Sequence, residues 1–105
     1  MADEFEKNIP RVRVEIICSQ ALEEDFAEEF EKNNVASHYT KIPSVMGAGY
    51  SNPHLGDAIW PQLNTMYLIY CSEEEAEKIK QIVVKLRKLF ITEGIGCFIG
   101  SGTEM

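Results

Sequence analysis

Positive charge is scarce in this chain. Its 105 residues contain ten lysines and arginines against 17 aspartates and glutamates, a formal net charge of −7 at pH 7. A protein with this balance repels a phosphate backbone, so we expect no nucleic-acid partner. Long apolar runs are also lacking, because no stretch approaches the roughly 20 residues that span a bilayer. The first residues, Met1 to Asn8, are polar and acidic and lack the apolar core of a secretory signal. We therefore expect a cytoplasmic protein.

Cysteine is equally sparse. The three cysteines, Cys18, Cys71 and Cys97, are odd in number, far apart and flanked by apolar residues. This pattern is not typical of a disulfide framework or a zinc site, so we expect buried free thiols. The length fits one domain, residues 1–105, in which 45% of the residues are apolar. A core of this size gains usefully from area buried between subunits.

Alternating polar and apolar residues predict the first strand over residues 11–18. One face carries Val12, Val14, Ile16 and Cys18, and the other carries Arg13, Glu15 and Ile17. The second face is too polar for a core and too apolar for free solvent, which indicates a subunit contact. Further strands are predicted over residues 36–45, where Pro43 indicates a sheet edge, and 65–71, whose apolar character indicates a central position.

Two amphipathic helices are predicted from apolar residues that recur every three or four positions. The first spans residues 21–33, with Ser19 as its N-cap. The second begins at a capping box, in which Ser72 accepts the Glu75 amide and Glu75 bonds back, and it ends at Gly94. The residues expected to be buried are Leu22, Phe26, Phe30, Ala76, Ile79, Ile82, Val83, Leu86, Leu89 and Phe90.

The resulting order, βαββαβ, is that of a ferredoxin-like α+β domain, with a polar leader over residues 1–10, a last strand over residues 95–99 and a flexible tail over residues 100–105. Right-handed crossovers place both helices on one face of a four-stranded antiparallel sheet, with the fourth strand beside the first, then the third and the second. The uncovered face is expected to collect Arg13, Glu15, Ile17, Phe98 and members of the pair Tyr67 and Ile69. This apolar content predicts a homo-oligomer.

The connection between the second and third strands, residues 46–64, is much longer than a hairpin needs. It holds three of the seven glycines, the only tryptophan and a single charged residue, Asp57. That composition favours a ligand or interface role over a solvated spacer, although an extended structural turn is the alternative. The candidate ligand and loop residues are Gly47, Gly49, Tyr50, His54, Asp57 and Trp60.

The chemistry available to these residues remains open. The amides of Gly47 and Gly49 suit a phosphate or carboxylate, but no lysine follows them as in nucleotide-binding loops. His38 and His54 are weak metal candidates, since no metal-ligand spacing accompanies them. A small metal-binding or metal-responsive protein that uses His38, His54 or a cysteine is therefore the alternative function. No nucleophile with its base is recognisable, so we expect no enzyme; an acid–base pair of His54 and Asp57 would need a pocket that the sequence does not reveal.

The chain resembles the nitrogen regulatory signal-transduction proteins of the PII type, in particular an atypical PII-like branch. The resemblance rests on the opening strand Val12-Arg13-Val14-Glu15-Ile16-Ile17, the glycine-bearing loop from Gly47 to Asn64, and the helix from Glu73. It implies a homotrimer built on the uncovered sheet face and small effectors in the clefts between subunits. It also implies that the long loop contacts a regulated target, such as a membrane transporter or an enzyme.

One family feature is missing. The family carries a phosphate-binding stretch with two lysines before the last strand, whereas residues 92–97 here read Thr-Glu-Gly-Ile-Gly-Cys. This departure argues against ATP or ADP and leaves the identity of the effector open. The hypothesis is a population shift: an effector near Gly47, Gly49, His54 and Trp60 selects one loop conformation that a partner recognises.

Overall fold

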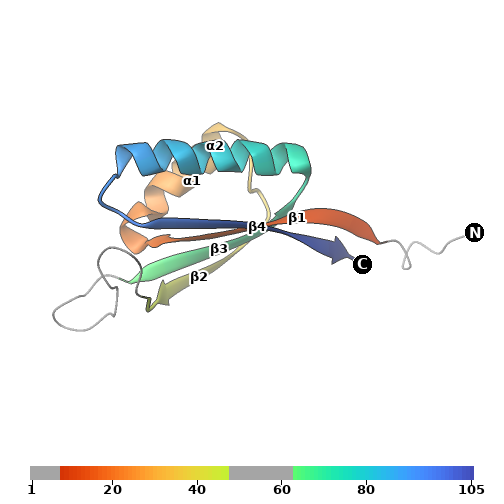
Figure 1. The fold of residues 1–105 in the computed structure, drawn as a ribbon, viewed down its shortest axis with the longest axis horizontal. Helices are drawn as coiled ribbons and strands as arrows, with labels where there is room; N and C mark the ends of the chain where they lie inside the picture. Colours follow the sequence, from red (N-terminus) through yellow and green to blue (C-terminus); the bar gives the residue numbers. More distant parts are fainter. Residues whose placement is uncertain (1–7, 48–62) are drawn as a thin grey trace, which may run out of the picture.

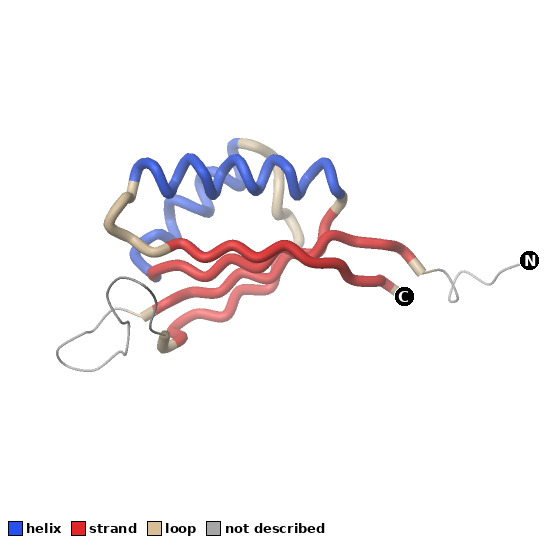
Figure 2. Tube along the Cα trace, in the orientation of Figure 1, coloured by secondary structure: helices blue, strands red, loops and turns tan. Residues whose placement is uncertain are grey.

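A computed structural model describes residues 8–47 and 63–105. Four strands form one antiparallel sheet in the order β2-β3-β1-β4, and both helices cover the same face of it (Figures 1 and 2). This confirms the predicted ferredoxin-like α+β fold and its strand order. The elements are β1 (Ile9–Ser19), a short 3-10 helix η2 (Gln20–Leu22), α1 (Glu23–Lys32), β2 (Tyr39–Val45), β3 (Asn64–Cys71), α2 (Glu73–Leu89) and β4 (Ile95–Glu104).

The core lies between the helices and the sheet. Val14, Ile16 and Cys18 of β1 are buried there, as the alternating pattern predicted. The expectation that Tyr67 or Ile69 lies on the uncovered face was wrong, because both are buried beneath the helices. Their register partners on β1 are Ile16 and Val14. Both faces of β3 are apolar, so only this register decides which side chains point toward the helices.

The helix starts follow the predicted capping residues. Ser19 Oγ accepts the Ala21 N–H at 3.2 Å, so this serine caps η2, and α1 begins only at Glu23. Ser72 Oγ accepts the Glu75 N–H at 3.1 Å and starts α2. The reciprocal half of the capping box was wrong, since the Glu75 carboxylate accepts the backbone N–H of Ala36 instead.

The end of α2 also differs from the prediction. The helix ends at Leu89, before Gly94, and Leu89 is 63% exposed rather than buried. Leu86 and Phe90 take the positions that face the core. Neither helix in the described part of the chain combines the length and apolar character needed to cross a bilayer.

The chain ends are part of the sheet. β4 continues to Glu104 and pairs with β1 as far as Ile9, so residues 100–104 of the predicted tail and the end of the predicted leader are strand, and the predicted flexible tail was wrong there. Gly100 and Gly102 suggested a flexible segment, but one of them has a packing role. A Cβ at Gly102 would lie 2.9 Å from Tyr70 Cε1, so the glycine makes room for the tyrosine ring.

The strand β2 lies at the edge of the sheet, as Pro43 predicted. It begins at Tyr39, later than expected, after Asn34 and Ala36, which both have φ of 53°. Its pairing with β3 is irregular between Ile42 and Val45. The three cysteines are free thiols; Cys18 and Cys71 are buried, and Cys97 is half-buried.

Candidate functional site

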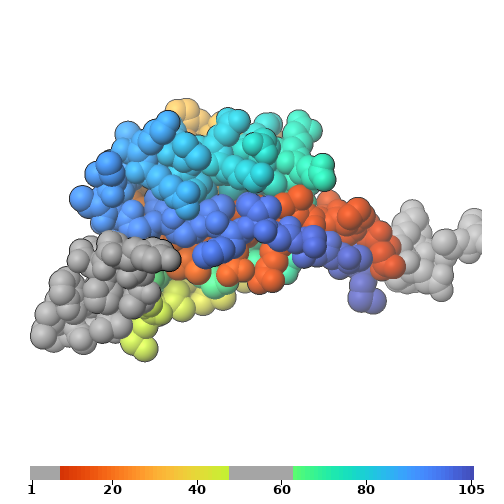
Figure 3. Space-filling model, in the orientation of Figure 1, coloured from red at the N-terminus to blue at the C-terminus, as the bar shows by residue number. Residues whose placement is uncertain are grey.

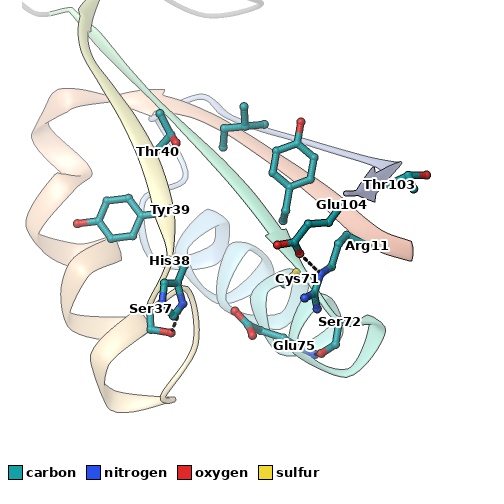
Figure 4. A pocket seen from close by; sticks show the side chains of 12 residues that line it. Arg11, Ser37, His38, Tyr39, Thr40, Cys71, Ser72, Glu75, Thr103 and Glu104 are labelled. Carbon is teal, nitrogen blue, oxygen red and sulfur yellow. Dashed lines mark hydrogen bonds and ion pairs between the residues drawn. The ribbon is translucent and has the colours of Figure 1, made fainter. Parts of the chain in front are cut away.

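A groove opens where β2 begins and β3 ends. The ladder between these strands starts at the pair Tyr39 and Ile69, so the last residues of β3, Tyr70 and Cys71, extend past the start of β2. The resulting space has a volume of about 1070 Å³ and is open to solvent (Figure 4). It is lined by Arg11, Ser37, His38, Tyr39, Thr40, Leu68, Tyr70, Cys71, Ser72, Glu75, Thr103 and Glu104.

The charges of this groove are mostly paired. Arg11 is the single lysine or arginine among the described lining residues, and its Nε donates to Glu104 Oε1 at 2.8 Å (Figure 4). Glu75 Oε2 accepts the Ala36 N–H at 2.9 Å. A guanidinium has five donors, and this ion pair uses one of them, so Arg11 can also hold a carboxylate or phosphate.

The groove continues onto the uncovered face of the sheet. Tyr70 is 51% exposed and Phe98 is 62% exposed on this face. In Figure 3, β4 runs along the side of the molecule between α2 and the underside of the sheet. Large exposed apolar patches mark contacts with other molecules. The apolar side chains of the face are Ile17, Ile42, Met66, Leu68, Tyr70 and Phe98.

One polar pair lies within this apolar face. Arg13 Nη2 is 3.0 Å from Glu15 Oε2. Arg13 Nε is buried and has no hydrogen-bond partner among the described residues. A buried donor without a partner is costly, so a polar group brought by another molecule would stabilise this position.

The predicted site residues are mostly outside the described residues. Five of the six candidates lie outside the ranges 8–47 and 63–105: Gly49, Tyr50, His54, Asp57 and Trp60. Gly47 lies two residues after the end of β2, and a Cβ there would lie 2.8 Å from Asn64 Nδ2. A glycine at this position therefore lets the two chain segments approach closely. The groove lies at the other end of β2, beside Tyr39, so the two regions are separate.

The described residues offer no cluster of metal ligands to support the alternative of a metal-binding protein. Within ranges 8–47 and 63–105, no group of three or more His, Cys, Asp or Glu side chains is placed to hold an ion. His38 is exposed on the rim of the groove, with Nδ1 3.2 Å from Ser37 Oγ.

Apart from His38, the weak metal candidate, the residues of the groove were not predicted as site residues from the sequence. Arg11 and Glu104 lie at opposite ends of the sequence, and only the β1–β4 register brings them together. The opposite charges of Arg11 and Glu104 were visible in the sequence. They indicate a site only once the pairing of β1 with β4 is known.

Comparison with solved structures identifies the fold. No protein-family model matches the chain, and no curated protein matches it in sequence. The structure of CPII bound to ADP and bicarbonate, from Thiomonas intermedia K12, is similar with a TM-score of 0.73 and 18% identity, over 93% of this chain and 91% of CPII. CPII bound to ADP, AMP and bicarbonate gives a TM-score of 0.70 and 17% identity, over 94% of this chain and 97% of that one.

A second PII-like structure supports the same assignment. A putative PII-like signalling protein from Thermus thermophilus matches with a TM-score of 0.65 and 19% identity, over 94% of this chain and 93% of that chain. The chain therefore has the PII-like fold that its sequence resemblance implied.

Proposed function

Given this PII-like fold, we propose that the chain is a non-catalytic regulatory protein that assembles as a homotrimer and binds a small effector between its subunits. The observation that carries the proposal is the continuity between the uncovered sheet face and the groove. Tyr70 and Leu68 belong to both. A second copy packed on the face would therefore border the groove and complete a cleft.

The effector in this proposal is a small anion or a molecule with one anionic group. CPII has been solved with ADP, AMP and bicarbonate. In this chain, residues 92–97 contain no lysine, so a phosphate has to find another cation. Arg11 is the groove's candidate, because a guanidinium matches the geometry of carboxylate, bicarbonate and phosphate.

The long connection, residues 46–64, is proposed to contact a regulated protein such as a transporter or an enzyme. Its length and its single charged residue support this role. Both flanking strands belong to the sheet, so the segment starts and ends at a common edge of the domain.

The effector proposal is tested by isothermal titration calorimetry of the purified chain. ADP and AMP are titrated separately, with and without bicarbonate, and bicarbonate is titrated alone. The proposal expects saturable binding of at least one of these ligands, with no more than one site per chain, and chemically unchanged ligand recovered afterwards. Absence of binding for all of them, at millimolar concentration, would overturn this effector class. Conversion of the ligand would overturn the non-catalytic role.

A further inference from the structure

A single carboxylate joins three elements of the fold. Glu23 is the first residue of α1. Its Oε1 accepts a hydrogen bond from Thr65 Oγ1 of β3, and its Oε2 accepts one from Lys41 Nζ of β2 at 2.8 Å. Thr65 is fully buried, and the side chains of Glu23 and Lys41 are about two-thirds buried. The two oxygens of one side chain thus bind both strands.

These strands are the ones that lead into and out of residues 46–63. β2 ends at Val45 and β3 begins at Asn64. The pairing of β2 with β3 is irregular near this end, because the register shifts between Ile42 and Val45. Pro43 has no N–H to donate, and Ser44 has φ of 59°. Backbone hydrogen bonds alone therefore fix the end of β2 less regularly than the start of β3, which also pairs with β1 at Ser19 and Cys18.

We propose that Glu23 is a positioning residue, whose carboxylate holds the ends of β2 and β3 against the start of α1. It sets the points at which the chain leaves the sheet after Val45 and returns to it at Asn64. A buried threonine hydroxyl needs an acceptor, and hydrogen bonds to a charged group are among the stronger ones. The clamp does not depend on the proposed effector, because all three side chains belong to the free chain.

The electrostatics agree with a formed clamp. The hydrogen bonds from Lys41 and Thr65 lower the pKa of Glu23, and Glu23 raises the pKa of Lys41. An exposed ion pair contributes little to stability. Here the buried Thr65 hydroxyl adds a second bond to the same carboxylate, which makes the arrangement directional.

The test is hydrogen–deuterium exchange of the full chain, followed by mass spectrometry of peptides that cover residues 39–45 and 64–67. Glu23→Gln removes the charge but keeps an oxygen for Thr65, and Glu23→Ala removes both acceptors. Glu24→Gln is the matched control, since the neighbouring Glu24 is exposed. We expect exchange in these peptides to rise about tenfold in Glu23→Gln, the factor for one lost charge-assisted bond, and further in Glu23→Ala.

Two results would overturn the inference. One is exchange in Glu23→Gln equal to that in Glu24→Gln. The other is an equal rise in the peptides of β2, β3 and α2, because that would report lost global stability rather than a local clamp. If Glu23→Ala does not fold, Glu23→Gln and Lys41→Met decide the question, since both keep the packing volume of the side chain. Lys41→Met is expected to accelerate exchange in residues 39–45.

Discussion

Glu75 and Ala36 are joined by a hydrogen bond of 2.9 Å, from the backbone N–H of Ala36 to Glu75 Oε2. Ala36 is 3% exposed and has φ of 53°, a backbone conformation that residues with a side chain rarely adopt. The first turn of α2 thereby holds the connection between α1 and β2 in place, at the border of the groove.

Replacement of this carboxylate should destabilise the protein. In Glu75→Ala the Ala36 N–H loses its acceptor, and we expect the free energy of unfolding to fall by about 1–3 kcal/mol. The measurement is urea unfolding followed by circular dichroism. Glu74→Ala, one residue earlier on α2 and exposed, is the control and should change the free energy by less than about 0.5 kcal/mol. Equal effects of the two variants would show that the bond contributes nothing.

Effector binding should depend on Arg11 and Glu104. Arg11→Met removes the groove's guanidinium and should weaken binding of the anion found by calorimetry at least tenfold. Glu104→Gln removes the carboxylate that competes for Arg11 and should leave binding unchanged or strengthen it. Lys88→Met, on the exposed part of α2, is the control. An Arg11→Met variant that binds like wild type would contradict the assignment of Arg11 to the effector.

The thiols should react slowly in the folded protein. Burial raises the pKa of Cys18 to about 12, and burial also raises the pKa of Cys71 and Cys97. Alkylation requires the thiolate, so iodoacetamide at pH 8 should label the native chain far more slowly than the chain in urea. Mass spectrometry of time points should find Cys97, the half-buried thiol, labelled before the other two. Rapid labelling of native Cys18 would contradict its place in the core.

The Glu23 clamp should also appear in the acid dependence of stability. Because the folded pKa of Glu23 lies below its unfolded value, its contribution is complete above about pH 5 and is lost as pH falls through the folded pKa. Lys41 is the charged group that faces the Glu23 carboxylate. Burial raises the pKa values of nearby Cys18 and Tyr67, so both stay neutral over this range. Urea unfolding of wild type and Glu23→Gln should therefore differ at pH 6 and converge toward pH 3. A constant difference over this range would contradict the clamp.

Much of the fold could be predicted because its local patterns agree with the tertiary structure. The alternation along β1 and the apolar spacing in both helices identify the core, and Pro43 identifies the edge strand. Two features could not be predicted from the sequence because they depend on how the strands pair and pack. The apolar residues on both faces of β3 leave its orientation undetermined. Gly100 and Gly102 suggest a flexible tail in the sequence. In the structure, Gly102 lies in a strand and makes room for the ring of Tyr70.

Less of the candidate site could be predicted. The groove takes between one and three residues from each of several elements, and no ligand-binding motif in the sequence connects them. Glu23 likewise belongs to no motif, because it is one of three acidic residues in the first turn of α1. Its partners Lys41 and Thr65 come from strands that only the sheet topology brings beside α1. The loop candidates from Gly49 to Trp60 lie outside the described residues and remain predictions.

The central claim is that copies of this chain cover the uncovered face of the sheet in one another. Native mass spectrometry at micromolar concentration tests this claim most directly. The prediction is an assembly of three chains of 11.9 kDa each for wild type. Phe98 lies on the uncovered face and is 62% exposed, so Phe98→Lys should give folded monomers. Ile91 is 84% exposed and lies outside this face, so Ile91→Lys should remain trimeric. A wild-type chain that is monomeric under these conditions would contradict the account.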